Sequence, residues 1–190
     1  MGIATYNVWY SATYERIFDM ANWSEFSSDL DKKIVCVFAW MPQAIMNIHH
    51  SGKGKNLVTK ASIYDPIKVY QVFEELKSVA KYFKDKNLTD TDLDDSLVKN
   101  RICKLCNPLF SILGSVATSK FLHFSYPYFF IMWDNSLRKK KQCKNSQDGY
   151  WEYLKKAQKA LKNKRIIKLA KKEYKFNPVR GLDVYWMKTK

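Results

Sequence analysis

Hydrophobic positions along the chain recur mostly at the spacing of an α-helix. In residues 65–83 the apolar side chains fall three and four positions apart, which places them on one face of a helix. Asp65 suits the cap that precedes this helix. Pro66 suits its first position, because proline lacks the N–H that the first turn leaves unbonded. The pattern therefore predicts a core helix over these residues.

A second apolar stripe runs through residues 27–41 and stops before Pro42. It predicts another helix, although the β-branched residues within 34–37 also fit a buried strand. Two adjacent histidines, His49 and His50, follow in a polar stretch. We expect them to lie in a solvent-exposed loop rather than in a metal site.

Residues 89–106 open with several aspartates and carry their cations later. That order is typical of a helix whose charges complement its dipole. The stretch lacks the glycine and the distal glutamate of a calcium loop, so the aspartates are expected to cap the helix. Asn107 and Pro108 are expected to end it.

The C-terminal part continues the helical pattern. Amphipathic helices are predicted within residues 148–163 and within residues 165–176. The segment of Asn177, Pro178 and Gly181 is expected to close the second of these, and residues 182–188 fit a short strand or a short helix. The sequence as a whole predicts an all-α fold.

Charge is distributed unevenly between the two parts of the chain. The formal net charge is +15; residues 135–190 hold 18 Lys and Arg against 4 Asp and Glu, whereas residues 1–134 hold 15 against 14. So concentrated a cationic surface favours a polyanion, through release of counterions from a phosphate backbone. Nucleic acid is the expected partner. An anionic membrane surface, an acidic protein surface and a merely solvated lysine face remain alternatives.

Composition argues against several classes of protein. The chain has 190 residues, 46% of them hydrophobic, which is enough for a core, and no run of 18 apolar residues that would span a membrane. The N-terminal residues lack the plan of a secretory signal, so we expect a soluble cytoplasmic protein. Cys103 and Cys106 have zinc-ligand spacing, but the other two cysteines lie far away, which favours packing. We expect no metal and no cofactor.

Residues 121–141 change from aromatic to strongly basic across a single acid, Asp134. They follow a turn at Gly114 and an apolar helix. This order resembles the core motif of the helix-hairpin-helix DNA glycosylases, the endonuclease III-like superfamily, whose loop has the form Pro-x-x-Phe-x-x-x-Asp-x-x-Val-Arg. The residues that match this loop are Pro127, Phe130, Asp134, Leu137 and Arg138. The resemblance covers residues 107–140.

The resemblance implies one glycosylase-like helical domain over residues 1–190, with the hairpin in 107–124 and a basic helical part, 135–190, packed on a near-neutral part, 1–134. It implies a monofunctional DNA glycosylase, which flips a base out of the duplex and cleaves its N-glycosidic bond. Asp134 would be the catalytic carboxylate. Lys120 lies about a turn beyond the place of the family's Schiff-base lysine and fits that role poorly.

Two further groups of residues acquire expected roles from the resemblance. One would hold the phosphate backbone through helix N-terminal amides and cations: Gly114, Ser115, Ser119, Arg138, Lys139, Lys140 and Lys141. The other would line a pocket for the flipped base: His123, Tyr126, Tyr128, Phe129 and Trp133. The family's hairpin usually reads Pro-Gly-x-Gly, whereas this one contains Gly114 alone.

The same residues also have purely structural explanations. Asp134 precedes the basic helix and would serve as its N-cap, which contributes about 1 kcal/mol. His123 and the aromatic residues of 121–133 also fit core positions. The non-catalytic alternatives are a helical protein that binds DNA or RNA, and a basic module that binds an acidic protein surface.

Overall fold

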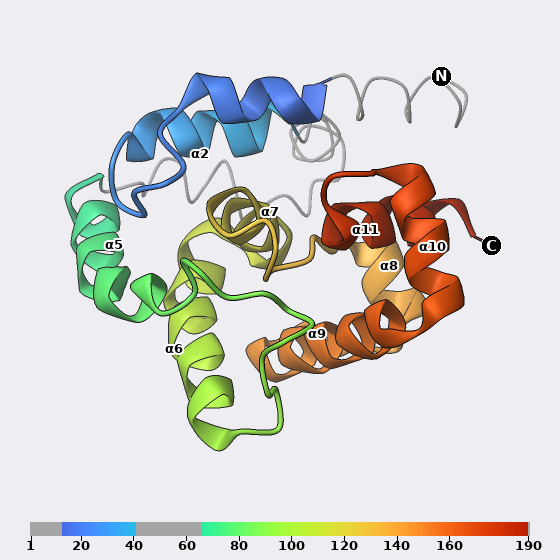
Figure 1. Ribbon diagram of the computed structural model, residues 1–190. Coiled ribbons are helices and arrows are strands. Elements are labelled where there is room, and N and C mark those ends of the chain that lie inside the picture. The colour runs from blue at the N-terminus through green and yellow to red at the C-terminus, as the bar shows by residue number, and fades with distance from the viewer. Residues whose placement is uncertain (1–12, 41–65, 190) are drawn as a thin grey trace, which may run out of the picture. The chain divides into compact units, whose positions relative to one another are not determined.

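The computed structural model describes residues 13–40 and 66–189. These residues form helices and loops, and no strand occurs among them (Figure 1). The all-α prediction is therefore confirmed for the described part of the chain. The chain divides into two compact units, residues 1–75 and 76–190. The predictions for His49, His50 and Asp65 lie outside the described residues.

The first unit contains a helical stretch at residues 13–20, α2 (Leu30–Ala39) and most of α5 (Pro66–Lys81). The helices predicted over 27–41 and 65–83 are confirmed, and the alternative of a buried strand at 34–37 is wrong. On α2 the stripe of Leu30, Ile34 and Val37 is buried.

A lysine is buried within this first unit. Lys33 donates from Nζ to the carbonyl oxygens of Glu25 and Phe26, and so satisfies two acceptors of the turn that precedes α2. Burial lowers the pKa of Lys33 to about 8, against the opposing effect of Asp29 and Glu25.

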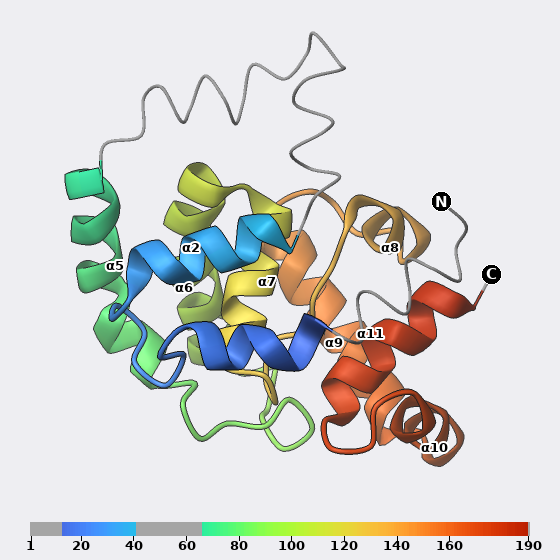
Figure 2. The ribbon, with the colours of Figure 1, turned by 90° about the horizontal axis from the view of Figure 1, so that it is seen from above.

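The second unit contains the remaining helices. α6 packs against α7 and α9, α9 also contacts α10 and α11, and α10 and α11 pack on each other (Figure 2). Their bounds are α6 (Ser96–Leu113), α7 (Ser115–Ser125), α8 (Asn135–Lys140), α9 (Gln147–Lys162), α10 (Lys164–Glu173) and α11 (Pro178–Lys188). The helices predicted within 148–163 and 165–176 are thus confirmed as α9 and α10.

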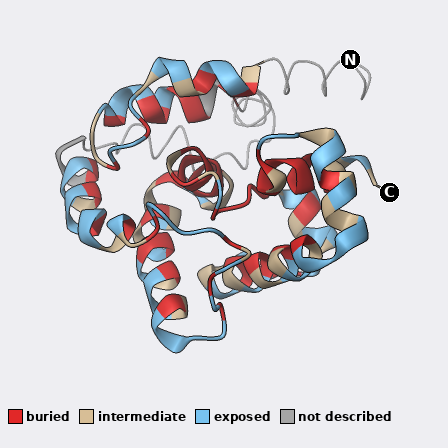
Figure 3. Ribbon diagram, in the orientation of Figure 1, coloured by how far each residue is buried: buried red, intermediate tan, exposed pale blue. Residues whose placement is uncertain are grey.

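α7 is the most deeply buried helix of the second unit. Residues 117–124 are buried without interruption, so that no side of this stretch faces water (Figure 3). Polar side chains on it need partners inside the protein, because an unsatisfied buried polar group costs about 1 to 3 kcal/mol. The buried polar residues of this stretch are Thr118, Ser119, Lys120 and His123, and the hydroxyl of Thr118 has no hydrogen-bond partner among the described residues.

Pro108 lies inside α6 and does not end it, so the expected helix end at Asn107–Pro108 is wrong. A proline in a helix interior removes one backbone hydrogen bond and crowds a carbonyl, at a cost of about 3 kcal/mol. The apolar stripe nevertheless continues across the proline, through the buried residues Leu105, Leu109 and Leu113. Burial of one leucine contributes about 1.5 to 3 kcal/mol, so Leu109 and Leu113 together offset the cost of the proline and the helix continues.

The segment of Asn177, Pro178 and Gly181 begins α11, so the expectation that it only closes the preceding helix is wrong. Asn177 Oδ1 accepts from the backbone N–H groups of Val179 and Arg180, at 2.9 and 3.1 Å, and Pro178 occupies the first position. A Cβ on Gly181 would lie 2.1 Å from the carbonyl oxygen of Ala170. Glycine is therefore required for α11 to approach α10 so closely.

Candidate functional site

The junction between α6 and α7 is a turn of one residue, Gly114, with φ +80°. Its N–H donates to the carbonyl of Phe110 and its own carbonyl accepts from the N–H of Thr118, both at 3.0 Å. A Cβ at this position would have no atom within 4 Å. Glycine is therefore favoured by the positive φ and not by a lack of space. The hydroxyl of Ser115 donates to Asn145 Oδ1 at 2.7 Å and ties the turn to the segment before α9.

Asp134 is the N-cap of α8. Its Oδ1 accepts from the backbone N–H of Leu137 at 2.7 Å, and its carbonyl accepts from the N–H of Arg138 at 2.9 Å. The side chain is partly exposed. The carboxylate thus performs the capping role, and its second oxygen forms no hydrogen bond within the described residues.

Asp134, which is partly exposed, lies near three buried charges that we call the buried charge cluster: Lys120 on α7, and Arg180 and Asp183 on α11. Arg180 and Asp183 form an ion pair in which the two residues are 1% and 3% exposed. Lys120 is 5% exposed. Burial lowers the pKa of Lys120 to about 8; Asp183 and Asp134 oppose this shift, and Arg180 adds to it.

The carboxyl of Asp183 experiences the opposite shift. Burial raises its pKa to about 6, although Arg180 and Lys120 favour the charged form, and the nearby Asp134 raises it further. Arg180 and Asp183 are not among the site residues expected from the sequence. The signal in the sequence is a weak one, a pair of opposite charges three residues apart within the mostly apolar segment 178–187.

The side chains expected to line a base pocket lie mostly in the core. Exposure is 7% or less for His123, Tyr126, Phe129 and Trp133, and 50% for Tyr128. Phe129 packs on Phe83 with ring centroids 4.8 Å apart, and Trp133 packs on Tyr150 at 4.9 Å. Trp133 Nε1 donates to the carbonyl of Ser115 at 3.1 Å. In this conformation Tyr128 is the one member of the set that faces solvent.

His123 and Ser119 bond inside the core. His123 Nδ1 lies 2.6 Å from the carbonyl oxygen of Phe130, which only accepts, so the proton resides on Nδ1. Burial lowers the pKa of His123 to about 3. Ser119 Oγ lies 2.8 Å from the carbonyl oxygen of Val116 and accepts from the N–H of Trp133 at 3.2 Å. Ser119 is fully buried, so its hydroxyl is inaccessible to a phosphate in this conformation.

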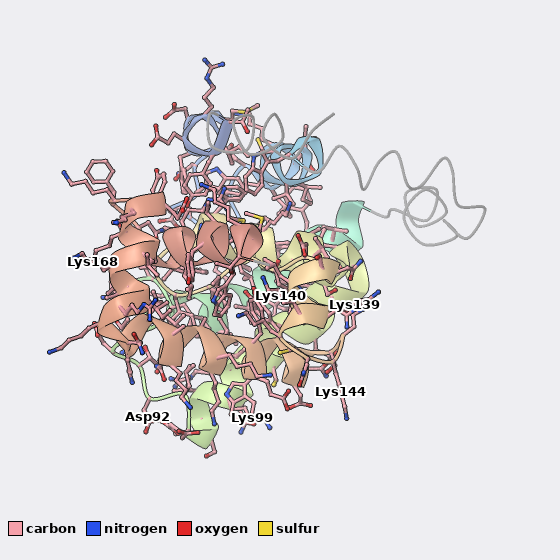
Figure 4. The ribbon with its side chains drawn as sticks, turned by 90° about the vertical axis from the view of Figure 1, so that its right-hand side faces the viewer. Asp92, Lys99, Lys139, Lys140, Lys144 and Lys168 are labelled. Atoms are coloured by element: carbon pink, nitrogen blue, oxygen red, sulfur yellow. The ribbon has the colours of Figure 1, made fainter. Side chains whose placement is uncertain are left out.

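The cations of α8 differ in how far they are available to a ligand. Arg138 Nη1 donates to the carbonyl of Cys143 at 3.2 Å. Lys140 Nζ donates to the carbonyl of Trp186 at 3.0 Å, and Lys141 Nζ lies 3.9 Å from the centre of the Trp186 ring. Lys139 is exposed and has no ion pair among the described residues. Figure 4 shows Lys139, Lys140 and Lys144 on one face of the molecule.

α10 carries a larger set of exposed cations, which we call the α10 basic face. No ion pair to any of them occurs within the described ranges. The nearby acids are already engaged, because Glu173 pairs with Lys188 and Asp183 with Arg180. The α10 basic face consists of Lys164, Arg165, Lys168, Lys171 and Lys172; Lys168 is labelled in Figure 4.

A pocket of about 330 Å³ lies elsewhere in the second unit, between the end of α5 and the start of α6. Four of its lining residues are acids: Asp85, Asp90, Asp92 and Asp95. Neither Asp134 nor the aromatic residues expected to hold a base line it. So acidic a surface repels a polyanion, and we therefore exclude it from the candidate site.

Comparison with known protein families, with curated proteins and with solved structures gives no match to this chain. None of the described helices has both the length and the apolar character that crossing a membrane requires. Within residues 13–40 and 66–189, no group of three or more His, Cys, Asp and Glu side chains is arranged to hold a metal ion. Cys106 is buried and Cys103 partly buried, both as free thiols.

Proposed function

We propose that this protein binds nucleic acid and holds the phosphate backbone against its basic C-terminal part. The observation that carries the proposal is the α10 basic face, five exposed cations without acidic partners in the described structure. Each cation that contacts a phosphate releases condensed counterions into solution, which favours binding entropically. The acids of the 82–98 pocket would orient the polyanion away from that side.

We further propose that Asp134 is the carboxylate of a glycosylase-type site on DNA. The order of elements supports this proposal: two helices joined at Gly114, a loop, and an acid at the N-terminus of a short basic helix. One carboxylate oxygen is held by the N–H of Leu137. The other would face the sugar and stabilise the positive charge that develops as the N-glycosidic bond breaks. The site would be monofunctional, because Lys120 is buried among the charges of α11.

A second candidate function is nucleic-acid binding without catalysis. It is favoured by the core positions of His123, Tyr126, Phe129 and Trp133, which leave Tyr128 as the accessible aromatic residue of the expected set. In that case Asp134 acts only as the cap of α8. The two candidates share the basic surface and differ in the role of one carboxylate.

Charge reversal on α10 tests nucleic-acid binding. We expect the triple variant Lys168→Glu, Lys171→Glu, Lys172→Glu to bind a DNA duplex at least about 100-fold more weakly than the wild type at low salt, because three phosphate contacts are lost. Fluorescence anisotropy with a labelled duplex measures this. The matched control is Lys81→Glu, Lys84→Glu, Lys104→Glu, which changes the net charge equally with exposed lysines outside the basic part. Equal losses in both variants would refute the proposed face.

Replacement of Asp134 by asparagine separates the two candidate functions. In the catalytic case, Asp134→Asn is expected to lower the rate of base release from damaged duplexes by at least about 100-fold, because the positive charge in the transition state loses its counter-charge. Duplex affinity would change little. The asparagine still accepts from Leu137 N–H, so the melting temperature reports whether the cap persists. Base release that survives the substitution would rule out a catalytic Asp134.

A further inference from the structure

Two aromatic side chains of the second unit project into solvent. Phe176, between α10 and α11, is 75% exposed, and Tyr128, between α7 and α8, is 50% exposed. Tyr126, Phe129 and Phe130 of the same loop are buried, so the exposure of Tyr128 contrasts with theirs. Large apolar side chains in water cost free energy unless a partner covers them.

The two loops that carry these residues are fixed to each other. Asn177 Nδ2 donates to the carbonyl of Pro127 at 2.9 Å. Phe176 directly precedes the donor residue of this hydrogen bond, and Tyr128 directly follows the acceptor residue. The carbonyl of Tyr128 also accepts from the N–H of Leu88 at 3.0 Å. Asn177 is itself held as the cap of α11. The backbone that presents both rings is therefore held in place by hydrogen bonds on each side.

A lysine lies near the exposed ring of Phe176. Lys175 Nζ lies 5.8 Å from the centre of its ring. The last members of the α10 basic face, Lys171 and Lys172, are exposed and precede Phe176 by five and four residues; the acid between them and Phe176, Glu173, is paired with Lys188. An exposed aromatic ring in the loop that follows a basic helix offers two kinds of contact, one with a base and one with a phosphate.

We propose that Phe176 and Tyr128 form a stacking platform for unpaired bases of a single-stranded nucleic acid, whose phosphates lie along the α10 basic face. This inference rests on the proposed nucleic-acid binding and names the form of the ligand. Bases of a duplex already stack on one another and offer no free face, whereas unpaired bases gain about 1 to 3 kcal/mol each by stacking on an aromatic side chain. Stacking uses the ring face that every base has, so the platform tolerates any sequence.

The charge of the surface selects this partner over a purely apolar one. A second protein with an apolar surface would cover the rings but leave the lysines of α10 without counter-charges. A single strand covers the rings with its bases and supplies counter-charges to the lysines with its phosphates, because bases and phosphates alternate along the strand. An anionic membrane also offers apolar and negative groups, and it is therefore included as a competing outcome of the test.

The test compares a short fluorescein-labelled oligothymidylate with its duplex form, at one low salt concentration. Phe176→Ala and Tyr128→Ala are each expected to weaken single-strand binding about 5- to 150-fold, and to change duplex binding less than about twofold. Phe176→Trp is expected to retain the affinity, whereas Phe176→Leu, which is apolar but has no ring, is not. Leu97→Ala is the matched control, since Leu97 is also an exposed apolar residue of this unit, 62% exposed.

The outcomes separate this inference from the proposed function. If Phe176→Ala, Leu97→Ala and the wild type bind the single strand with equal affinity, the stacking platform is overturned. Duplex binding that remains intact in these proteins still supports the proposed role of the α10 basic face. Wild-type protein that binds neither oligonucleotide overturns both. Binding to phosphatidylserine vesicles that depends on Phe176, without oligonucleotide binding, overturns both in favour of a membrane surface.

Discussion

Replacing Asp183 by leucine is expected to lower the free energy of unfolding by about 3 to 5 kcal/mol. The substitution removes the carboxylate that pairs with Arg180 and leaves a guanidinium, 1% exposed, without this partner. Lys120, also buried and positive, lies close enough to interact with both residues, so repulsion increases at the same time. Unfolding by urea, followed by circular dichroism, measures the loss.

The double variant Arg180→Met, Asp183→Leu is the decisive control for this prediction. It removes both charges of the pair and replaces them with apolar side chains of similar size, so most of the loss is expected to be recovered. A double variant that is as unstable as Asp183→Leu alone would show that packing, rather than the unpaired charge, causes the loss. A single variant that loses less than about 1 kcal/mol would contradict the burial of the ion pair.

Acid is expected to destabilise the protein through His123, by roughly 4 to 5 kcal/mol between neutral pH and pH 3. The pKa of His123 is lowered from 6.5 to about 3 by burial. Below pH 6.5 the unfolded chain therefore binds a proton that the folded protein does not bind. Stability falls as the pH falls, and the loss is complete near the folded pKa. The free energy of unfolding, measured across this range, reports the effect.

His123→Asn isolates this contribution from other titrating groups. The amide of asparagine does not titrate, and its Nδ2 can replace Nδ1 as the donor to the carbonyl of Phe130. Asp183 acts in the opposite direction, because its pKa is raised to about 6 and protonation stabilises the fold as the pH falls towards 4. The wild type and His123→Asn share that effect. The difference between their free energies of unfolding therefore reports the contribution of His123. Parallel curves for wild type and variant would contradict the assignment.

The helices could be predicted from the sequence where an apolar stripe dictated them. On α9, for example, Tyr150, Tyr153 and Leu154 follow the helical period and are buried. Boundaries that depend on one residue were less predictable. Pro108 stays inside α6 because burial on either side outweighs the hydrogen bond it removes, and Pro178 begins a helix because Asn177 caps it.

The buried charge cluster could not be predicted, for a different physical reason. Charged residues three positions apart on a helix are usually exposed, and the sequence alone does not show that α11 turns Arg180 and Asp183 inward. That placement depends on Gly181, which lets α11 approach α10 closely. The cap at Asp134, in contrast, follows from local sequence, since an acid before a short basic helix is a common N-cap.

The central claim is that the α10 basic face holds a phosphate backbone. The salt dependence of duplex binding tests this claim most directly. A plot of log K against log salt concentration is expected to fall steeply for the wild type. In the Lys168→Glu, Lys171→Glu, Lys172→Glu variant the magnitude of this slope is expected to be smaller by about 2.7, because each of the three lost phosphate contacts removes about 0.9 from it. A shallow slope that is the same in both proteins would contradict the account.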